Sequence, residues 1–280
     1  MPLPTFLGIG VQRSGTTWLH TLLANHPDVY MPTGRKEIRF FDRYYERGVG
    51  WYATFFCTPE DAHRYKAIGE ISTQYYDCPE CPKRIFTTLP ESKLIIMLRH
   101  PVSRAYSHYG FTVQRGNYRG SFEDFIVARP TTIQKGYYSQ YLKQYLRYFD
   151  RAQILALLSE NVFTNVLETK KTLASFLGIA TEKFPSSFTG TGEKVNASSV
   201  PTFQSLYGFI VKRGRRLRRH NLEPVVDFVK RLGIDRILAK GKPLPPLNEE
   251  LKKRISQLYQ DEFDELEQCM QIDLSCWKNK

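Results

Sequence analysis

The sequence predicts an α/β fold in one domain, with a central parallel sheet flanked by helices, because short apolar runs alternate with helical patterns. A chain of 280 residues with 41% hydrophobic residues can bury a core without metal or disulfide support. We expect one domain over residues 1–280, with a variable, basic region at residues 190–245 inside it. Four apolar runs have the length of buried strands: Thr5–Val11, Lys66–Ile71, Lys93–Leu98 and Gln153–Leu158.

Several segments between and after these strands carry apolar residues at helical spacing. In the first, Trp18, Leu19, Leu22 and Leu23 fall on one helix face. The small, polar stretch Thr189–Pro201 predicts a long loop. The expected helices are Thr16–Asn25, Pro82–Leu89, Ser139–Phe149, Val166–Leu177 and Asn248–Met270.

The charge balance indicates an anionic partner. The chain has 40 Lys and Arg against 28 Asp and Glu, a formal net charge of +12. Nucleic acid, a membrane surface, or a phosphorylated or sulfated small molecule would all satisfy this charge. No run of about 18 apolar residues is present, so no membrane-spanning helix is expected.

Five cysteines leave three interpretations open. Cys78 and Cys81 have the spacing of a redox motif, and with Cys269 and Cys276 they offer four thiolates for zinc. The wide spacing of the second pair argues against zinc, and the lack of a thioredoxin-like strand before the motif argues against redox chemistry. We therefore expect structural or incidental thiols, Cys57 included.

The segment Gly10–Thr17 follows the first predicted strand and opens the first predicted helix. Its spacing is that of a phosphate-binding loop, in which glycines permit a tight turn and N–H groups at the helix start attract phosphate. Thr16 stands where such loops carry lysine, and Arg13 puts a cation inside the loop. Because similar turns occur where nothing binds, the loop alone does not establish a site.

A second basic motif follows the strand Lys93–Leu98. Arg99 stands where a nucleotide triphosphatase commonly carries an aspartate near magnesium, so an anionic group is a better ligand here than a metal. Pro101 suits a first helical turn, and Ser107 lies two turns beyond Arg99. A guanidinium and a hydroxyl can then share one phosphate. The alternative is a surface ion pair and a solvated helix face.

Together the two motifs resemble the signature of PAPS-dependent sulfotransferases. The resemblance rests on Arg13-Ser14-Gly15-Thr16-Thr17-Trp18 and on Arg99-x-Pro-x-x-Arg104-x-x-Ser107-x-Tyr109, about 85 residues apart. It runs from Thr5 to Leu177, including Gly69-Glu70-Ile71-Ser72, and recurs over Leu247–Trp277. It implies that Arg99 and Ser107 hold the 3′-phosphate of PAPS. It also implies that the 5′-phosphosulfate is held by Arg13, Ser14, Gly15, Thr16, Thr17 and Trp18.

The segment Lys36–Asp42 supplies the candidate general base. It resembles the Lys-Glu-x-His-Phe-Phe-Asp motif of glycosaminoglycan-type sulfotransferases, where the glutamate is the base. By position Glu37 is the base and Lys36 contacts the sulfuryl group, while Arg39 replaces the histidine with a fixed charge suited to an anionic acceptor. The alternatives are a surface salt bridge for Glu37, and a histidine base at His100 or His108.

The expected activity is in-line transfer of a sulfuryl group from PAPS to a hydroxyl or amine acceptor, with a carbohydrate or glycolipid favoured. Fixed cations and N–H dipoles suffice for a transferred group of low charge, so we expect PAPS as cofactor, PAP as product and no metal. A nucleotide kinase on the same scaffold and a non-enzymatic polyanion-binding module are the alternatives.

Two further features bear on partners. The run Lys212–His220 holds six Lys and Arg side chains and suits a solvated face, a lid over the acceptor, or peripheral contact with a membrane rather than nucleic acid. The aromatic residues Phe40, Phe41, Tyr44, Tyr45, Trp51 and Tyr52 suit either an acceptor groove or the core. No leader pattern precedes the first strand, which predicts a cytoplasmic, bacterial-type enzyme, or a Golgi enzyme that has lost its N-terminal anchor.

Overall fold

The computed structural model describes residues 1–186, 199–201 and 241–278. The chain divides into two compact units, and each is described by itself below. The first unit combines Met1–His100, Tyr137–Val195 and Leu258–Lys280, and the second combines Pro101–Gly136 and Asn196–Gln257. A single domain over residues 1–280 stays a prediction.

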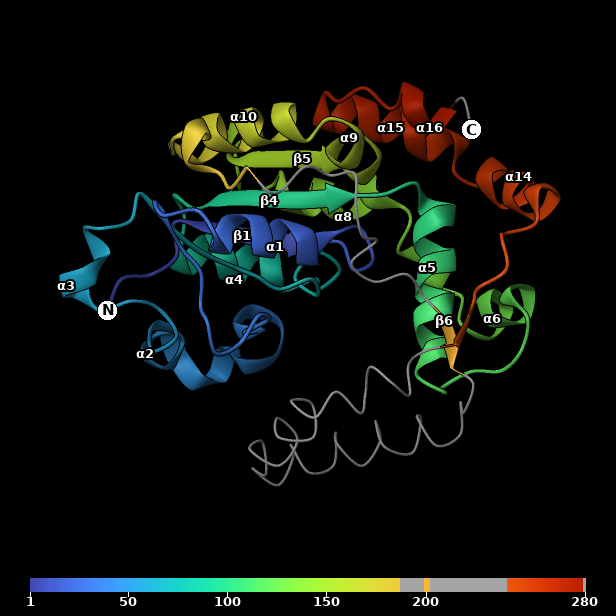
Figure 1. The fold of residues 1–280 in the computed structure, drawn as a ribbon, viewed down its shortest axis with the longest axis horizontal. Coiled ribbons are helices and arrows are strands. Elements are labelled where there is room, and N and C mark those ends of the chain that lie inside the picture. Colours follow the sequence, from blue (N-terminus) through green and yellow to red (C-terminus); the bar gives the residue numbers. More distant parts are fainter. Residues whose placement is uncertain (187–198, 202–240, 279–280) are drawn as a thin grey trace. The chain divides into compact units, whose positions relative to one another are not determined.

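The first unit is built on a parallel sheet with strand order β2-β3-β1-β4-β5 (Figure 1). Four of its strands were predicted to within two residues at either end. The fifth, β2, is two residues long and carries no recognisable run. The strands are β1 (Phe6–Gly10), β2 (Val29–Tyr30), β3 (Ala67–Ile71), β4 (Lys93–Leu98) and β5 (Ile154–Leu158).

Helices flank this sheet, which confirms the predicted α/β fold. The helix predicted over residues 166–177 has those bounds, and those predicted over residues 16–25 and 82–89 match to within one residue at either end. The helix predicted over residues 139–149 starts one residue earlier and ends four residues earlier, at Tyr145. The helices of the first unit are α1 (Thr16–Ala24), α2 (Gly48–Ala53), α3 (Pro59–Ala62), α4 (Cys81–Thr88), α8 (Tyr138–Tyr145), α9 (Ser159–Thr164), α10 (Val166–Leu177), α15 (Gln260–Met270) and α16 (Ser275–Lys278). Shorter turns are the π-helical η1 (Phe40–Tyr44) and the 3₁₀ turns η2 (Tyr45–Arg47), η3 (Arg151–Gln153) and η4 (Thr181–Lys183).

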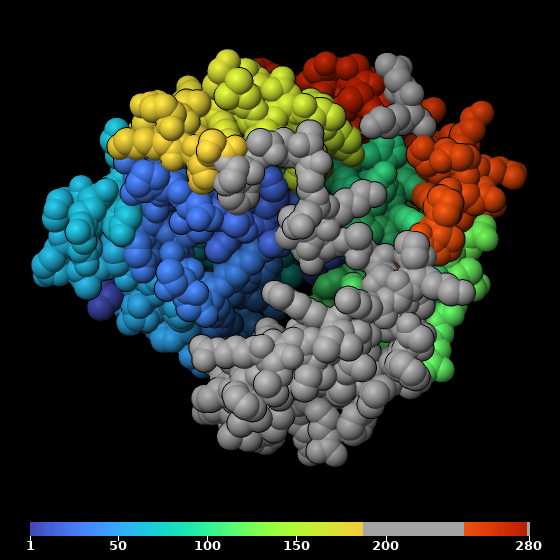
Figure 2. Space-filling model, viewed as in Figure 1, coloured from blue at the N-terminus to red at the C-terminus, as the bar shows by residue number. Residues whose placement is uncertain are grey.

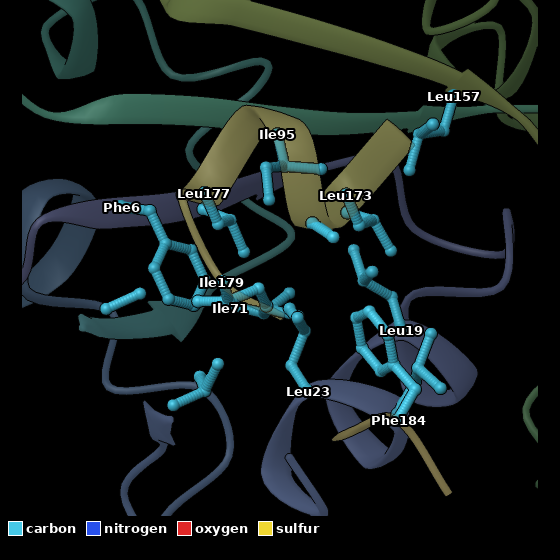
Figure 3. Close-up of a cluster of buried hydrophobic side chains, with 14 of the residues drawn as sticks. Phe6, Leu19, Leu23, Ile71, Ile95, Leu157, Leu173, Leu177, Ile179 and Phe184 are labelled. Atoms are coloured by element: carbon cyan, nitrogen blue, oxygen red, sulfur yellow. The ribbon is translucent and has the colours of Figure 1, made fainter. Parts of the chain in front are cut away.

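One core cluster joins α1 and α10 to the sheet (Figure 3). Leu19 and Leu23 from α1 and Leu173 from α10 are at most 1% exposed and pack with strand residues such as Ile95. On the surface, α10 and the segment after it lie beside the N-terminal part of the unit (Figure 2). The apolar residues whose spacing predicted both helices are therefore the residues that pack against the sheet.

The predicted helix over residues 248–270 is wrong in one respect, because it is two helices. The helix α14 (Glu249–Gln257) belongs to the second unit and α15 to the first. Tyr259 interrupts them with φ −111° and ψ 11°. Its buried ring packs against Tyr137 at 5.0 Å, and the Tyr137 hydroxyl donates to the Leu258 carbonyl at 3.1 Å. This packing compensates for the broken helical turn.

The second unit contains α5 (Pro101–Gln114), α6 (Phe122–Ala128), α7 (Thr131–Gln134) and α14. Its strands β6 (Ser199–Pro201) and β7 (Gly241–Pro243) pair antiparallel, so the last three residues of the predicted loop 189–201 are a strand. Residues 189–198 of that loop and the basic run 212–220 lie outside the described residues. Within the described part, no helix has the length and hydropathy needed to cross a bilayer.

A buried carboxylate fastens α15 to the start of α8 in the first unit. Glu262 is 3% exposed and accepts hydrogen bonds from the backbone N–H and the hydroxyl of Ser139, both at 2.7 Å. The same hydroxyl lies 2.6 Å from Glu265 Oε2, although it has one hydrogen to donate. Burial raises the pKa of Glu262 from its ordinary value of 4.5 to about 7, and the hydrogen bonds from Ser139 oppose that rise.

This raised pKa predicts a pH-dependent contribution to stability. Between the unfolded and folded pKa values, the folded chain binds more protons than the unfolded chain, so this stabilisation is complete below pH 4.5 and is lost as the pH rises through about 7. The free energy of unfolding should therefore fall by up to about 1.4 kcal/mol per pH unit on account of this group. Urea denaturation from pH 5 to 8 should show wild type losing stability relative to Glu262→Gln.

The exposed Glu168, on α10, provides the matched control. Wild type and Glu168→Gln should run parallel over the same pH range. A constant difference between wild type and Glu262→Gln would contradict the assignment.

Candidate active site

Three loops of the first unit meet at one edge of the sheet. The strands β3, β1 and β4 are neighbours and run parallel. Their carboxyl ends therefore lie at the same edge, where ligands of open α/β sheets bind. The residues that follow these strands are Val11–Gly15, which we name the β1–α1 loop, Ser72 and Thr73 after β3, and Arg99 after β4.

The β1–α1 loop takes a conformation that depends on glycine. Arg13 and Gly15 both have positive φ, 76° and 94°. A Cβ on Gly15 would lie 2.9 Å from Phe163 Cζ and 3.0 Å from Met97 Cε. A larger residue at position 15 would thus suffer both backbone strain and a clash, which accounts for glycine there.

Gly15 is also the residue that caps α1, and the loop presents polar groups toward the helix start. Among the described residues, no side-chain hydrogen bond caps α1, so the N–H groups of Thr16 and Thr17 suit an anion. Ser14 is 1% exposed, and its Oγ has no hydrogen-bond partner among the described residues. An orphaned hydroxyl beside a helix N-terminus fits a phosphate-bearing ligand.

Two side chains hold the β1–α1 loop against the end of β4. Ser159 Oγ, at the start of α9, lies 2.5 Å from the Ser14 carbonyl oxygen and 2.8 Å from that of Leu98. Arg99 Nη1 donates to the Arg13 carbonyl oxygen at 3.2 Å. The structure therefore brings Arg99 to the predicted phosphate loop, as expected for two halves of one site.

The backbone around Arg99 is fixed by residues from the C-terminal part of the chain. Tyr138 donates its hydroxyl to the Arg99 carbonyl at 2.7 Å. Glu160 accepts from the His100 N–H and from Trp277 Nε1, both at 3.0 Å. The His100 ring is buried and lies 6.0 Å from the Trp277 ring, so its surroundings are those of a core residue. This packing favours Glu37 over His100 as the base.

The candidate base segment reaches the β1–α1 loop through Lys36. Lys36 Nζ donates to Thr17 Oγ1 at 2.8 Å. Glu37 Oε1 accepts from Thr73 Oγ1, after β3, at 3.0 Å. Burial lowers the pKa of Lys36, and the neighbouring Glu37 carboxylate opposes this. The structure thus brings Lys36, Glu37, Arg13 and Arg99 to one edge of the sheet.

Trp18 has a different environment from the rest of the predicted cofactor residues. It is 7% exposed, and its ring meets Phe163 edge-on at 5.6 Å. The indole therefore belongs to the packing beneath the loop. Contact between Trp18 and a cofactor stays a prediction.

Ser107 and His108 lie on α5, in the second unit, so their relation to the β1–α1 loop is not described. Pro101 is the first residue of α5, as predicted. Arg104, from the same motif, is buried and donates to the Thr132 carbonyl within that unit. The role of Ser107 in holding a 3′-phosphate stays a prediction.

The aromatic cluster after the base segment is divided between core and surface. Phe40, Phe41 and Tyr52 are fully buried, whereas Tyr44 and Trp51 are half-buried. Around the Tyr44 ring stand the guanidinium groups of Arg35, Arg43 and Arg47, at 5.1, 5.4 and 5.1 Å from its centroid. A hydrogen bond from Arg35 and the nearby arginines lower the pKa of Tyr44. We name these four residues the arginine–tyrosine cluster.

Arg39 was expected to offer its charge to an anionic acceptor, but its side chain is paired with a carboxylate of the protein. Its Nε donates to Asp42 Oδ2 at 2.9 Å, and the two side chains form an ion pair. The backbone of Arg39 has φ 61°, in the left-handed region. The arginine–tyrosine cluster is therefore the more available source of positive charge beside Glu37.

Sequence reasoning named Glu70 and Ser72 within the resemblance but did not assign them the support of the base segment. Glu70, in β3, is fully buried and accepts hydrogen bonds from Tyr75 at 2.5 Å, Ser72 at 2.7 Å and Tyr52 at 3.2 Å. Burial raises the pKa of Glu70 to about 7, against the effect of these hydrogen bonds. A glutamate inside an otherwise apolar strand is the signal that could have identified it.

All five cysteines are free thiols. Among the described residues, no group of three or more His, Cys, Asp or Glu side chains is arranged to hold a metal ion, and this includes the four thiols considered for zinc. The zinc interpretation of these cysteines is therefore not supported.

Comparisons with known proteins identify the family of the chain. The family described as "Sulfotransferase domain" matches residues 3–266. Mouse bifunctional heparan sulfate N-deacetylase/N-sulfotransferase 3 is 29% identical over 288 residues, covering 94% of this chain. The chain spans only 29% of the length of that relative.

Solved structures share the fold. A sulfotransferase from Alicyclobacillus acidocaldarius superposes with a TM-score of 0.70 at 22% identity, covering 99% of this chain and 100% of that one. A mouse sulfotransferase complexed with PAP has a TM-score of 0.50 at 13% identity and covers 96% of this chain and 88% of that one. The family match favours neither the kinase nor the polyanion-binding alternative. The chain belongs to the sulfotransferase domain family.

Proposed function

We propose that the protein transfers a sulfuryl group in line from PAPS to a hydroxyl or amine of a carbohydrate-type acceptor, with Glu37 as general base. The observation that carries this proposal is the meeting of three segments at one sheet edge. Lys36 Nζ lies 2.8 Å from Thr17 Oγ1, and Arg99 Nη1 lies 3.2 Å from the Arg13 carbonyl oxygen. Side-chain contacts thus join the β1–α1 loop and the helix start to the second basic motif and to the base segment.

The residues present fit the donor. In this proposal the N–H groups at the start of α1 and the Ser14 hydroxyl hold the 5′-phosphosulfate, while Arg99 and Ser107 hold the 3′-phosphate. PAPS supplies the activated sulfuryl group when it is bound. Arg13 and Lys36 carry the positive charge that stabilises the leaving bisphosphate and the sulfuryl oxygens. No step in this scheme requires a metal ion.

Glu37 suits the role of base because a hydroxyl orients its carboxylate and because Lys36 and Arg39 place positive charge near it. Its Oε1 accepts from the Thr73 hydroxyl at 3.0 Å, which fixes the direction of the carboxylate. The other carboxylate oxygen is then available to an acceptor proton within hydrogen-bond reach. Lys36, next in sequence and beside Thr17, places positive charge close to the same point.

The proposed acceptor class follows from the relatives and from the surface beside Glu37. The relative from mouse is named for heparan sulfate, an anionic glycan, and for N-sulfotransferase activity. Arg35 Nε donates to the Glu37 carbonyl at 3.1 Å, so the arginine–tyrosine cluster adjoins the base segment. Guanidinium groups over a ring suit carboxylate or sulfate groups of such an acceptor. The cytoplasmic location and the membrane contact of residues 212–220 stay predictions.

A thermal-shift screen without magnesium tests the donor class. PAP at a hundred times its dissociation constant should stabilise the folded chain by about 2.7 kcal/mol, because it binds only the folded state. ATP with magnesium should give no comparable shift, since the β1–α1 loop has threonine where a kinase has lysine. Stabilisation by ATP with magnesium, or by heparin alone, would favour the kinase or the polyanion-binding module instead.

Glu37→Gln should lower turnover at least about a hundredfold, since the amide cannot accept the acceptor proton. PAP affinity, measured by calorimetry, should stay close to that of wild type. Glu46→Gln is the matched control, because Glu46 is an exposed carboxylate nearby in the chain. Near-normal turnover in Glu37→Gln would remove Glu37 from this role.

Arg99→Ala should weaken PAP more than AMP, which lacks the 3′-phosphate. A charge-assisted hydrogen bond to phosphate accounts for about ten- to a hundredfold in affinity. Because Arg99 also donates to the β1–α1 loop, part of the loss should be common to both nucleotides. The excess loss for PAP measures the 3′ contact, and Arg64→Ala, at an exposed ion pair, is the control. Equal losses for both nucleotides would refute the assignment of Arg99.

A further inference from the structure

Glu70 is an ionisable side chain at an unfavourable place. It lies in β3, an interior strand of the sheet, and is 0% exposed, as are its neighbours within the strand or nearly so. Burying a carboxylate costs free energy unless donors surround it, and an apolar residue would serve the sheet as well. A carboxylate at this position therefore indicates a role that an apolar side chain could not fill.

The groups around Glu70 are all donors. The hydroxyls of Tyr75 and Tyr52 donate to Oε1 at 2.5 and 3.2 Å, and that of Ser72 donates to Oε2 at 2.7 Å. The backbone N–H of Ile38 is close enough to help lower the pKa of this carboxylate. An ionised carboxylate accepts from all of them at once, which a neutral amide or a protonated acid cannot do.

Two of these hydroxyls also accept hydrogen bonds from the backbone of the base segment. The N–H of Phe40 donates to the Tyr75 hydroxyl at 2.9 Å, and the N–H of Arg39 donates to Ser72 Oγ at 3.0 Å. Each of these two hydroxyls donates its one hydrogen to Glu70. A lone pair of its oxygen is therefore left to accept from the backbone N–H. The N–H groups of Arg39 and Phe40 are thus each connected to Glu70 through one hydroxyl.

The tied segment is strained and leads directly to the proposed base. Arg39 has φ 61°, which a non-glycine residue keeps only where its surroundings hold it. Glu37 precedes the tied N–H groups, and its partner Thr73 follows Ser72 after β3. The backbone that follows Glu37 and the Thr73 hydroxyl that binds its carboxylate therefore both depend on the chain around Glu70.

We propose that Glu70 is a positioning residue: by accepting the hydrogens of Tyr75 and Ser72, it fixes the backbone of residues 38–40 and so aims Glu37 at the acceptor. This inference rests on the proposed function, in which Glu37 is the base. Glu70 itself does not touch the reacting groups in this scheme.

The first test is Glu70→Gln, which keeps the size of the side chain. One oxygen becomes an NH₂ donor, so one hydroxyl must turn and one N–H of residues 39 and 40 loses its acceptor. The kcat should fall at least tenfold, with the acceptor KM and PAP affinity changed by less than threefold. Glu70→Asp keeps the charge and should recover part of the lost kcat. A kcat within twofold of wild type in Glu70→Gln overturns the inference.

A double-mutant cycle with Glu37→Gln separates positioning from general loss of structure. If Glu70 acts through Glu37, Glu70→Gln should lower the residual turnover of Glu37→Gln by less than twofold. If Glu70→Gln lowers turnover by the same factor in wild type and in Glu37→Gln, the positioning role is contradicted. Tyr75→Phe removes one hydroxyl of the relay and should behave like Glu70→Gln. Tyr145→Phe is its control, because that buried hydroxyl donates to the Tyr75 carbonyl and not to Glu70.

Amide hydrogen exchange gives a measurement that is independent of activity. Exchange at residues 38–40 should be at least tenfold faster in Glu70→Gln than in wild type, while exchange in α10 should not change. Unchanged exchange at residues 38–40 refutes the inference even where wild type is active. If wild type transfers no sulfuryl group, the proposed function fails, and the exchange rates still decide whether Glu70 holds the segment. Should Glu70→Gln not fold, Tyr75→Phe decides by the same measurements.

Discussion

The parallel pairing of β1 with β3 on one side and β4 on the other is the constraint on which the candidate site depends. Gly8 of β1 pairs with Ile71 and with Ile95. A Cβ on Gly8 would lie 2.5 Å from Ile71 Cγ1, so the absence of a side chain permits this close approach. A change in that pairing would separate the β1–α1 loop from Thr73 and Arg99.

Contacts within the protein hold the β1–α1 loop in place. The carbonyl groups of Ser14 and Arg13 in the β1–α1 loop contact the side chains of Ser159 and Arg99. Such preorganisation reduces the free energy needed to order the loop around an anion. Burial lowers the pKa of Lys36, and an anion bound beside it would raise that pKa again.

Local patterns predicted the scaffold, and loop chemistry predicted the residues that meet at the sheet edge. Apolar runs identified four strands because parallel strands are buried on both faces, whereas β2 has two residues and no such run. The contact of Lys36 with Thr17 confirms that the base segment and the β1–α1 loop are neighbours. The break at Tyr259 was not predictable from helical spacing, because it depends on packing against Tyr137.

The support of the base segment illustrates why the rest was not predicted. The relay from Glu70 joins β3 to residues more than thirty positions earlier through hydroxyl groups whose orientation depends on tertiary structure. The pair Arg39 and Asp42 likewise changes the expected role of a charge. A sequence shows which groups are available, whereas the direction of a hydroxyl hydrogen is decided only by the fold.

The bridge from Trp277 through Glu160 to the His100 backbone has a consequence for biosynthesis. Ribosomes make the β1–α1 loop first and then Arg99, both well before Trp277. The indole that completes the support beside Arg99 emerges only after more than 170 further residues. A nascent chain therefore contains the β1–α1 loop and Arg99 well before the contact between Trp277 and Glu160 can form.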